Sequence, residues 1–341
     1  MNSSVARRVL GLSVQEWALV GITMIWGGTF LVVHTAMQHS GPWFFVGFRF
    51  LAAGLFAAAI FWRSLRGMSW REFGAGAAIG AAIYGGYGLQ TAGLQTIDSS
   101  TSAFMTAFYV PLVPLLQWLV LRKPPRALTL VGAGLAFVGL LLVAGIGSRG
   151  IQLGTGEILT LISTLPIAGE IILISLFGGR FDVGRLTVVQ LLTASVLGFA
   201  TMPLAGEPIP AFDPVWLIAG LAMGLASGLI QLTMNWAQRS VSATRATIIY
   251  TGEPVWAGVV GRIAGERIPP LAILGAGLII AGTLLSELQP RRADGGAAED
   301  PGAEDPAPGE PGTDRATDDR GVGPAQDPEP EGREAAPRAG A

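Results

Sequence analysis

The chain repeats a four-residue phrase: Gly132-Ala133-Gly134-Leu135 returns 143 residues later as Gly275-Ala276-Gly277-Leu278. The same shift superimposes other identical residues across more than forty positions, namely Gln95 on Gln238, Ser99 on Ser242, Thr101 on Thr244, Ala103 on Ala246, Pro111 on Pro254 and Gly139 on Gly282. One register held over this distance indicates a duplicated structural unit. Because the phrase lies in an apolar segment both times, the duplicated unit is a membrane unit.

The composition supports a membrane protein and excludes several kinds of site. Half of the residues are hydrophobic and 13% are charged, compared with about a quarter charged in soluble domains. Cysteine is absent, which excludes disulfides, thiolate metal sites and cysteine nucleophiles. Two histidines are too few for a histidine metal cluster. We expect no metal, no cofactor and no nucleic-acid partner.

Charge is divided unevenly along the chain. From Arg291 onward there are thirteen acidic residues and six arginines, whereas the preceding residues carry a net positive charge. Residues 290–341 are rich in Pro, Gly, Ala, Asp and Glu and almost lack large apolar side chains, so we predict a disordered acidic tail. A solubilising extension is favoured over a regulatory or partner-binding segment because the tail has no recognition motif.

A helix needs about twenty apolar residues to cross the hydrocarbon core. Ten stretches meet or approach this length: residues 16–36, 43–62, 73–93, 101–121, 127–146, 156–177, 186–204, 214–236, 246–263 and 270–288. The first lacks the short apolar core and small-residue cleavage site of a signal peptide, so we expect it to be retained. We predict an all-α integral membrane protein with ten transmembrane helices.

Basic residues in short loops indicate orientation because they are enriched on the cytoplasmic side of membranes. With both termini placed in the cytoplasm, the interior receives fourteen Lys and Arg residues, and the exterior receives Arg149, Arg262 and Arg267. This asymmetry predicts two cytoplasmic termini in a multi-pass protein of the cell inner membrane.

Ten spans shared between two repeats give five spans each, and an odd number turns the second repeat upside down. We predict a cytoplasmic N-terminus at residues 1–15, a first five-helix repeat at 16–146, an inverted five-helix repeat at 147–289 and a cytoplasmic tail at 290–341. Two oppositely oriented halves can open in turn to either side of the membrane around a site near the midplane. The sequence thus predicts alternating access.

Four stretches carry a resemblance to one family: Trp26-Gly27-Gly28-Thr29-Phe30, Arg49 with Ala52-Ala53, Gly93-Leu94-Gln95 leading into Ser99 to Phe104, and Tyr250-Thr251-Gly252-Glu253-Pro254. Their order, the ten spans and the duplication resemble the EamA-type drug/metabolite transporter superfamily. The resemblance implies a bacterial inner-membrane carrier, most often an exporter of amino acids, metabolites or toxic small molecules, with its site between the five-helix halves. Arg122-Lys123-Pro124-Pro125 departs from the usual Gly-Glu-Arg turn, which the second repeat keeps as Gly265-Glu266-Arg267.

Three ionisable side chains lie deep in the predicted spans, where a charge is costly and marks a functional site: Arg49, Glu170 and Glu253. Arg49 either neutralises a substrate carboxylate or bonds helix ends or a glutamate inside the bundle. Glu170 lies one turn after Pro166, and we expect a broken helix there because proline removes a backbone donor. Glu170 either binds the coupling proton or cation, or pairs with Arg49 to stabilise the bundle.

Glu253 precedes a proline that has a counterpart in the first repeat. Pro254 matches Pro111, and each frees the carbonyl four residues earlier, so we predict broken helices at matching places in both halves. Such paired breaks point to a binding site. For Glu253 itself, a second coupling candidate, a gating or helix-bonding role is favoured over substrate contact.

Polar and aromatic side chains supply a candidate lining for a small amphipathic solute. Tyr84, Tyr87 and Gln90 follow one another at three-residue spacing on the third span. Gln231 and Asn235 share a face of the eighth span, and Trp26 and Tyr250 complete the predicted substrate site.

These features favour a secondary transporter that exports a small organic solute, with proton coupling as one option. No Gly-x-x-x-x-Gly-Lys-Ser/Thr loop is present, so gradients are the expected source of energy. A nutrient importer of the same fold is the alternative, since direction is not encoded in composition. An intramembrane enzyme or lipid-handling protein has weaker support, because the chain has no Gly-x-Ser-x-Gly elbow and no metal constellation. We expect no enzyme. The expected partners are a small-molecule substrate and the lipid bilayer, with protons or another coupling ion as an option, and the sequence does not distinguish a monomer from a dimer.

Overall fold

A computed structural model describes residues 12–121, 127–143 and 153–287. The helices below belong to one compact unit, Met1–Pro290. The predictions for residues 1–11, for the loop at 122–125, for Arg149 and for the acidic tail fall outside the described residues.

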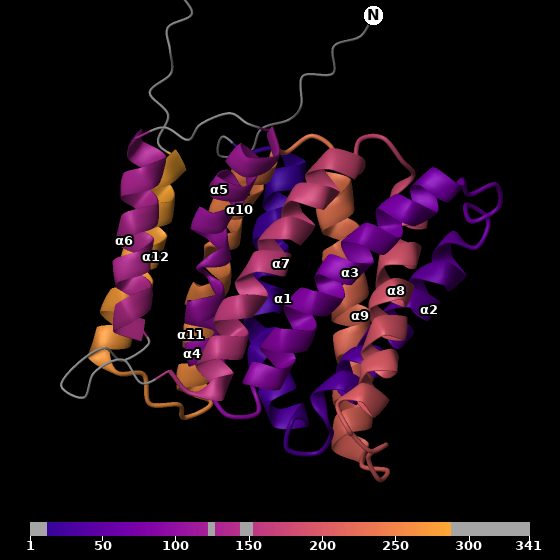
Figure 1. Ribbon diagram of the computed structural model, residues 1–341, viewed down its shortest axis with the longest axis horizontal. Helices are drawn as coiled ribbons and strands as arrows, with labels where there is room; N and C mark the ends of the chain where they lie inside the picture. Colours follow the sequence, from indigo (N-terminus) through magenta and orange to yellow (C-terminus); the bar gives the residue numbers. More distant parts are fainter. Residues whose placement is uncertain (1–11, 122–126, 144–152, 288–341) are drawn as a thin grey trace, which may run out of the picture. The chain divides into compact units, whose positions relative to one another are not determined.

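The described residues form twelve α-helices (Figure 1). They are α1 (Val14–Ala36), α2 (Pro42–Phe61), α3 (Trp70–Gly93), α4 (Ser99–Thr106), α5 (Tyr109–Leu121), α6 (Ala127–Val143), α7 (Thr155–Phe177), α8 (Val183–Leu204), α9 (Pro214–Ala237), α10 (Ala243–Tyr250), α11 (Gly252–Ile263) and α12 (Pro270–Glu287). Ten predicted stretches are recovered to within a few residues, and the fourth and the ninth are each divided into two helices.

Polar side chains fix the points at which helices begin. At α1, Ser13 Oγ accepts a hydrogen bond from the Glu16 amide at 3.3 Å, and Glu16 Oε2 accepts one from the Ser13 amide at 2.7 Å. Ser69 and Glu72 form the same capping box at α3. These boxes satisfy amide groups that have no partner within the first helical turn.

The two capping glutamates also tie the predicted first repeat to the second. Arg185, at the start of α8, donates through Nη1 to both carboxylate oxygens of Glu72 at 3.0 Å. Arg245, in α10, donates through Nε to Glu16. The beginnings of α3 and α8 therefore lie together, and so do those of α1 and α10.

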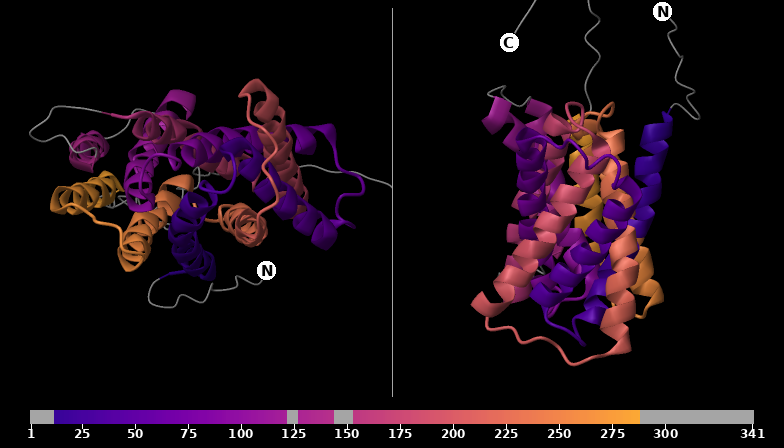
Figure 2. Two further views of the ribbon diagram at one scale, coloured as in Figure 1. Left: turned by 90° about the horizontal axis from the view of Figure 1, so that it is seen from below. Right: turned by 90° about the vertical axis from the view of Figure 1, so that its right-hand side faces the viewer.

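The repeated phrase lies where α6 and α12 pack side by side (Figures 1 and 2). A β-carbon added to Gly139 would fall 2.9 Å from the Ile279 amide nitrogen and against the Gly275 carbonyl. One added to Gly282 would fall 2.8 Å from the Ala136 amide nitrogen. The two helices thus approach so closely that only glycine fits at these positions, as in small-residue packing of membrane helices.

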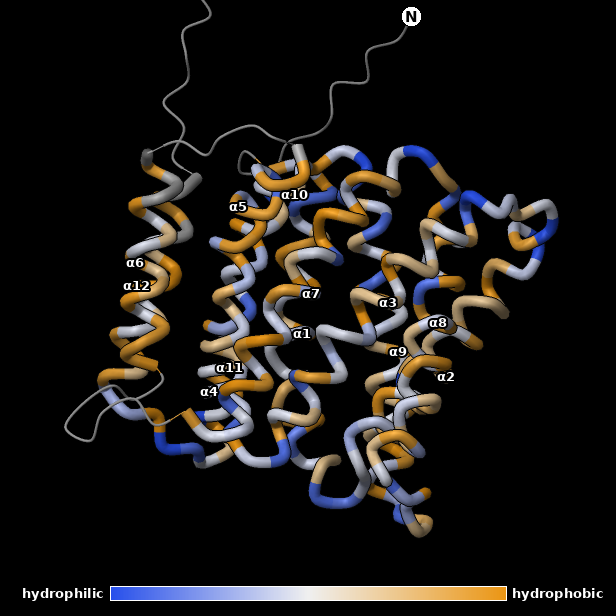
Figure 3. The backbone as a smooth tube through the Cα atoms, in the orientation of Figure 1, coloured by the Kyte–Doolittle hydropathy of each residue, from blue (hydrophilic) through white to orange (hydrophobic). Residues whose placement is uncertain are grey.

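Hydrophobic residues predominate along the helices, and hydrophilic residues gather toward the helix ends (Figure 3). Within the described residues, six stretches are long and apolar enough to cross a membrane: Val14–Ala36, Pro42–Phe61, Ser99–Val120, Thr155–Phe177, Val183–Leu204 and Pro214–Ala237. Exposed large side chains such as Leu119, Val196 and Ile218 are suited to contact lipid.

Candidate functional site

The three ionisable side chains predicted to lie deep in the spans are all buried. Arg49 is 2% exposed, Glu170 is fully buried and Glu253 is 1% exposed. They come from α2, α7 and α11, and therefore from both predicted repeats. Buried charges of this kind require polar partners or a ligand.

A directional chain of side-chain amides ends on Glu170. Asn235 Nδ2 donates to Gln190 Oε1 at 3.1 Å, Gln190 Nε2 donates to Gln231 Oε1 at 2.8 Å, and Gln231 Nε2 donates to Glu170 Oε1 at 2.7 Å. Asn235 also donates to Thr187 Oγ1 at 3.0 Å. Because every amide dipole points the same way, the bonds reinforce one another toward the carboxylate. We call Asn235, Gln190, Gln231 and Glu170 the amide chain.

Arg49 bonds to a serine and lies over two aromatic rings. Its Nε donates to Ser227 Oγ at 2.7 Å, and its guanidinium carbon lies 5.1 Å from the ring centroids of both Phe50 and Tyr87. The described residues contain no ion pair between Arg49 and Glu170. The salt bridge expected as an alternative is therefore not formed in this structure, in which Arg49 bonds to Ser227 and Glu170 accepts a hydrogen bond from Gln231.

Aromatic side chains from four helices, α1, α3, α5 and α10, lie around the second carboxylate and the guanidinium. Trp26 stacks on Tyr87 with ring centroids 6.4 Å apart and meets Tyr250 edge-on at 5.6 Å. Tyr109 of α5 donates its hydroxyl to Glu253 Oε2 at 3.1 Å. Gln238 Nε2 donates to the hydroxyl of Tyr250 at 3.0 Å. We call Trp26, Tyr87, Tyr109 and Tyr250 the aromatic wall.

Each buried carboxylate keeps one oxygen free. Among the described residues, Glu170 Oε2 and Glu253 Oε1 have no hydrogen-bond partner although both are fully shielded. A buried carboxylate oxygen without a donor is costly, and it is satisfied by a proton on that oxygen or by an N–H or O–H of a ligand. Each of these two oxygens is thus a buried acceptor without a donor.

Two predicted lining residues direct their hydrogen bonds elsewhere. Tyr84 is half-buried and shares a 2.5 Å hydrogen bond with Thr201 Oγ1, with its ring 5.8 Å from that of Trp43. Gln90 Nε2 donates to Thr106 Oγ1 at 3.1 Å. The bonds and ring contacts above therefore involve six of the eight predicted substrate-site residues, Trp26, Arg49, Tyr87, Gln231, Asn235 and Tyr250, together with Glu170 and Glu253, but not Tyr84 or Gln90.

Helix breaks occur just before Pro111 and Pro254 but not at Pro166. α4 ends and α5 begins on either side of Ala107 and Phe108, just before Pro111, and α10 passes into α11 at Thr251, just before Pro254. Both breaks fall where the sequence predicts them. The break expected at Pro166 is wrong, because α7 runs continuously through it. Gly85 of α3 lies against the Pro166 ring, where an added β-carbon would be 3.3 Å away.

Ser227 and Tyr109, the hydrogen-bond partners of Arg49 and Glu253, are not predicted from the sequence, although the helical spacing of Ser227 could have indicated it. Ser227 precedes Gln231 by four residues and Asn235 by eight, so all three share one face of α9. Tyr109 carried no such signal, because its partner Glu253 lies 144 residues away.

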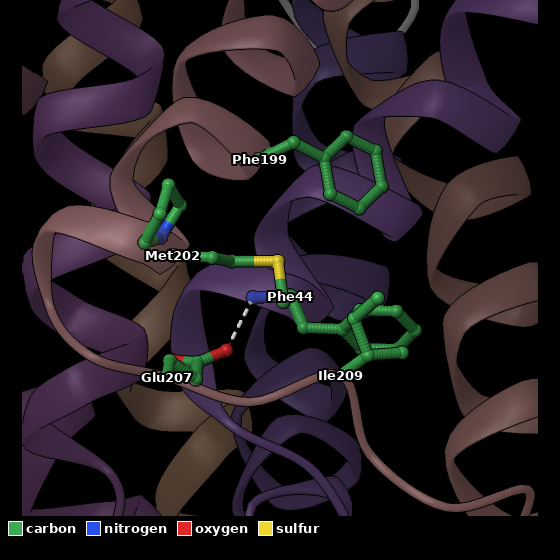
Figure 4. Close-up of a pocket in the computed structure, with 6 residues that line it drawn as sticks. Phe44, Phe199, Met202, Glu207 and Ile209 are labelled. Carbon is green, nitrogen blue, oxygen red and sulfur yellow. Dashed lines mark hydrogen bonds between the residues drawn. The ribbon is translucent and has the colours of Figure 1, made fainter.

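A surface pocket is lined by none of the residues of the amide chain or the aromatic wall. This pocket, of about 360 Å³, is lined by Phe44, Phe199, Met202, Pro203, Glu207 and Ile209 (Figure 4). Its carboxylate, Glu207, accepts hydrogen bonds from the amides of Trp43 at 3.0 Å and Phe44 at 2.6 Å. Glu207 is therefore committed to capping α2 and is not available to a ligand.

Comparison with known proteins gives one family. The profile of the EamA-like transporter family matches residues 15–145 and 154–288. An uncharacterized transporter of Archaeoglobus fulgidus is 28% identical over 275 residues, covering 80% of this chain and 86% of the relative. The uncharacterized inner membrane transporter YedA of Escherichia coli K12 is 28% identical over 282 residues, covering 80% and 90%. A solved structure described only as the crystal structure of a protein has a TM-score of 0.60 at 14% identity, covering 79% of this chain and 94% of its own.

Proposed function

Because the chain belongs to the EamA-like transporter family and is a membrane transporter, we propose that it is a secondary carrier that exports a small organic solute in exchange for protons. The solute is an amino acid, a metabolite or a drug, and it crosses by alternating access. The observation that carries the proposal is the free oxygen of buried Glu170 at the end of the amide chain.

The proposed architecture has ten crossings in two inverted five-helix repeats, residues 16–146 and 147–289. Each broken pair, α4 with α5 and α10 with α11, makes one crossing. Contacts between helices support alternating directions. Gly139 meets Gly275 while Gly132 meets Gly282, so α6 and α12 run antiparallel, as the fifth and tenth crossings would. In contrast, α2 and α9, the second and eighth crossings, run parallel, with Gly220 against Phe48 and Gly224 against Ala52.

The α6–α12 contact also supports the inversion itself. Gly139 and Gly282 are equivalent in the repeat, and so are Gly132 and Gly275. Each glycine meets the counterpart of the other, which is the reciprocal pattern produced by a twofold axis. The loop charges support the proposal that both termini, with the tail at residues 290–341, are cytoplasmic.

The proposed transport site lies between the amide chain and the aromatic wall. Trp26, Tyr87 and Tyr250 offer apolar ring faces, and Gln231, Asn235 and Arg49 offer directed polar groups. Apolar walls with a few oriented polar groups favour a small amphipathic molecule. Tyr84 and Gln90 belong to the edge of this site, where the solute would enter or leave.

The bonding of Glu170 supports proton exchange. Gln231 donates to Oε1, and Oε2 has no partner. A proton on Oε2 removes the negative charge that a cationic group of the solute would need, so the two compete for Glu170, and that competition is the requirement for antiport. Protons that enter down their gradient drive the solute outward. Glu253 is a second proton acceptor beside the α10–α11 break, where Tyr109 holds its other oxygen.

The proposal is tested in two steps on the full-length protein. A thermal-shift panel of amino acids, nucleosides, sugars and cationic dyes identifies a compound that raises Tm. That compound is then used in proteoliposomes with an acidic lumen. We expect wild type to accumulate it, and E170Q to lose accumulation while retaining exchange of labelled for unlabelled compound.

E157Q is the matched control, because it makes the same substitution at the first turn of the same helix, α7. It should accumulate the compound as wild type does. Uphill accumulation by E170Q at the wild-type rate would refute proton coupling through Glu170. Absence of exchange by wild type for every compound that raises Tm would refute the solute-carrier proposal.

A further inference from the structure

An apolar groove of about 740 Å³ lies on the surface between α11 and α12. Val255, Val259 and Ile263 of α11 form one wall, and Ile273 and Gly277 of α12 form the other. Phe104 of α4 also lines it. The wall residues of α11 are 46% to 81% exposed, so the groove is open to the surroundings of the helices. We call it the α11 groove.

Two exposed arginines lie at one end of the groove. Arg262 and Arg267 both line it, and neither forms an ion pair within the described residues. The nearby carboxylate of Glu266 is occupied, since it accepts hydrogen bonds from the amides of Ser99 and Ser100 at 3.0 Å each. Arg262 Nη1 instead donates to the Glu266 backbone carbonyl at 3.4 Å. The guanidinium groups of both arginines are thus able to pair with an anion from outside the protein.

These arginines lie on the side of the membrane that has few basic residues. Under the proposed orientation, only Arg149, Arg262 and Arg267 face the exterior, whereas fourteen basic residues face the cytoplasm. Two of the three exterior arginines therefore line the same groove. A cluster of positive charge at the membrane surface attracts anionic lipid headgroups.

The length of the groove matches one leaflet. It extends along α11 from Arg262 to Pro254, eight residues or about 12 Å at 1.5 Å of rise per residue. Half of the hydrocarbon core is about 15 Å thick. An acyl chain that starts at the arginines would therefore reach the α10–α11 break, where Pro254 follows the buried Glu253.

We propose that the α11 groove binds an anionic phospholipid of the outer leaflet. The phosphate lies between Arg262 and Arg267, and one acyl chain fills the groove as far as Pro254. The bound chain packs against the helix that carries Glu253 and so supports the break beside it. This site is separate from the transported solute and does not depend on which solute is carried.

The experiment measures lipid binding to the purified full-length protein by native mass spectrometry. The probes are phosphatidylglycerol and phosphatidylcholine with identical acyl chains. We expect wild type to bind phosphatidylglycerol more tightly, and R262Q/R267Q to lose about fivefold in affinity for each arginine, or about 25-fold together. R180Q/R239Q, which removes two exposed arginines from the opposite side under the proposed orientation, should bind as wild type does.

A second pair of variants tests the acyl chain. Gly277→Leu projects into the groove at a position with nothing within 4 Å, so it should block binding without disturbing packing. Gly134→Leu is the matched control, because Gly134 is the repeat counterpart, also has nothing within 4 Å, and lies outside the groove.

Equal affinity for the two lipids in wild type would overturn the proposal. Loss of phosphatidylglycerol binding in R180Q/R239Q or Gly134→Leu to the same extent as in the groove variants would also overturn it, because the effect would then be one of total charge or of lipid-facing bulk. Unchanged phosphatidylglycerol binding in every variant would likewise overturn the proposal, and it would indicate that a second copy of the chain or the solute fills the groove.

Discussion

The two glycines of the repeated phrase should respond oppositely to the same substitution. A β-carbon on Gly275 would lie 2.9 Å from Val143 N and Val143 Cγ2, whereas one on Gly277 would have nothing within 4 Å. Replacing glycine by alanine within a helix gains about 0.5–1 kcal/mol, and overpacking a close contact costs about 1–3 kcal/mol. We expect G277A to be more stable than wild type by about 0.5–1 kcal/mol and G275A to be less stable by about 1–2 kcal/mol.

The assay is the apparent Tm of purified full-length protein in detergent, measured by loss of the monodisperse peak in size-exclusion chromatography after heating. One kcal/mol corresponds to about 2 °C for a chain of this size. The two variants should therefore differ by about 3–6 °C. G139A and G134A form a second matched pair on α6, since Gly139 is enclosed by α12 and Gly134 is open. Equal Tm changes for G275A and G277A would refute the described packing of α6 against α12.

Two further predictions concern stability. S227A removes the acceptor of the buried Arg49 Nε and should lower stability by about 1–3 kcal/mol, seen as a Tm drop that S240A, at an exposed serine, does not reproduce. Partial burial raises the pKa of Glu266, but hydrogen bonds from Ser100 and Ser99 outweigh it and bring the pKa below its ordinary value. Because the folded pKa is depressed, the contribution of Glu266 is complete above the unfolded pKa and is lost as pH falls through the folded one. The Tm of wild type should therefore fall more than that of E266Q between pH 6 and pH 3; parallel curves would contradict this.

The helices were predictable because membrane burial imposes one simple rule on composition. The expected stretch at residues 156–177 corresponds to α7, Thr155–Phe177, since an apolar run of this length has no other stable conformation in lipid. The breaks before Pro111 and Pro254 were predictable too. Pro111 is followed by Pro114, and Pro254 is preceded by Gly252, so each site has two residues that weaken a helix.

No break occurs at Pro166 because that proline has no second helix-weakening residue directly beside it. Thr164 and Leu165 precede it, so the helix loses only one hydrogen bond there, and Gly85 of α3 leaves room for the proline ring. Sequence therefore locates a proline but does not report the neighbouring helix that tolerates it.

The composition of the candidate site was largely predictable, whereas its bonding was not. A charge inside an apolar span is visible in the sequence, so Arg49, Glu170 and Glu253 could be found without a structure. Their partners depend on which helices become neighbours. Gln231 lies 61 residues from Glu170, and Ser227 lies 178 residues from Arg49, separations at which spacing along one helix carries no information.

The reciprocal glycine contacts between α6 and α12 bear on how the chain arose. Under the proposed inverted repeat, a single five-helix unit with this face could pair with an inverted copy of itself, and the one chain would then hold internally the contact that two separate chains would make. In such a pair, every substitution alters two contacts at once. In one fused chain that constraint is absent, and Gly139 and Gly282 can be substituted one at a time. Both are glycine in this chain, whereas Glu253 has Val110 at the equivalent position of the first repeat, so the contact between the halves is symmetric and the charges beside it are not.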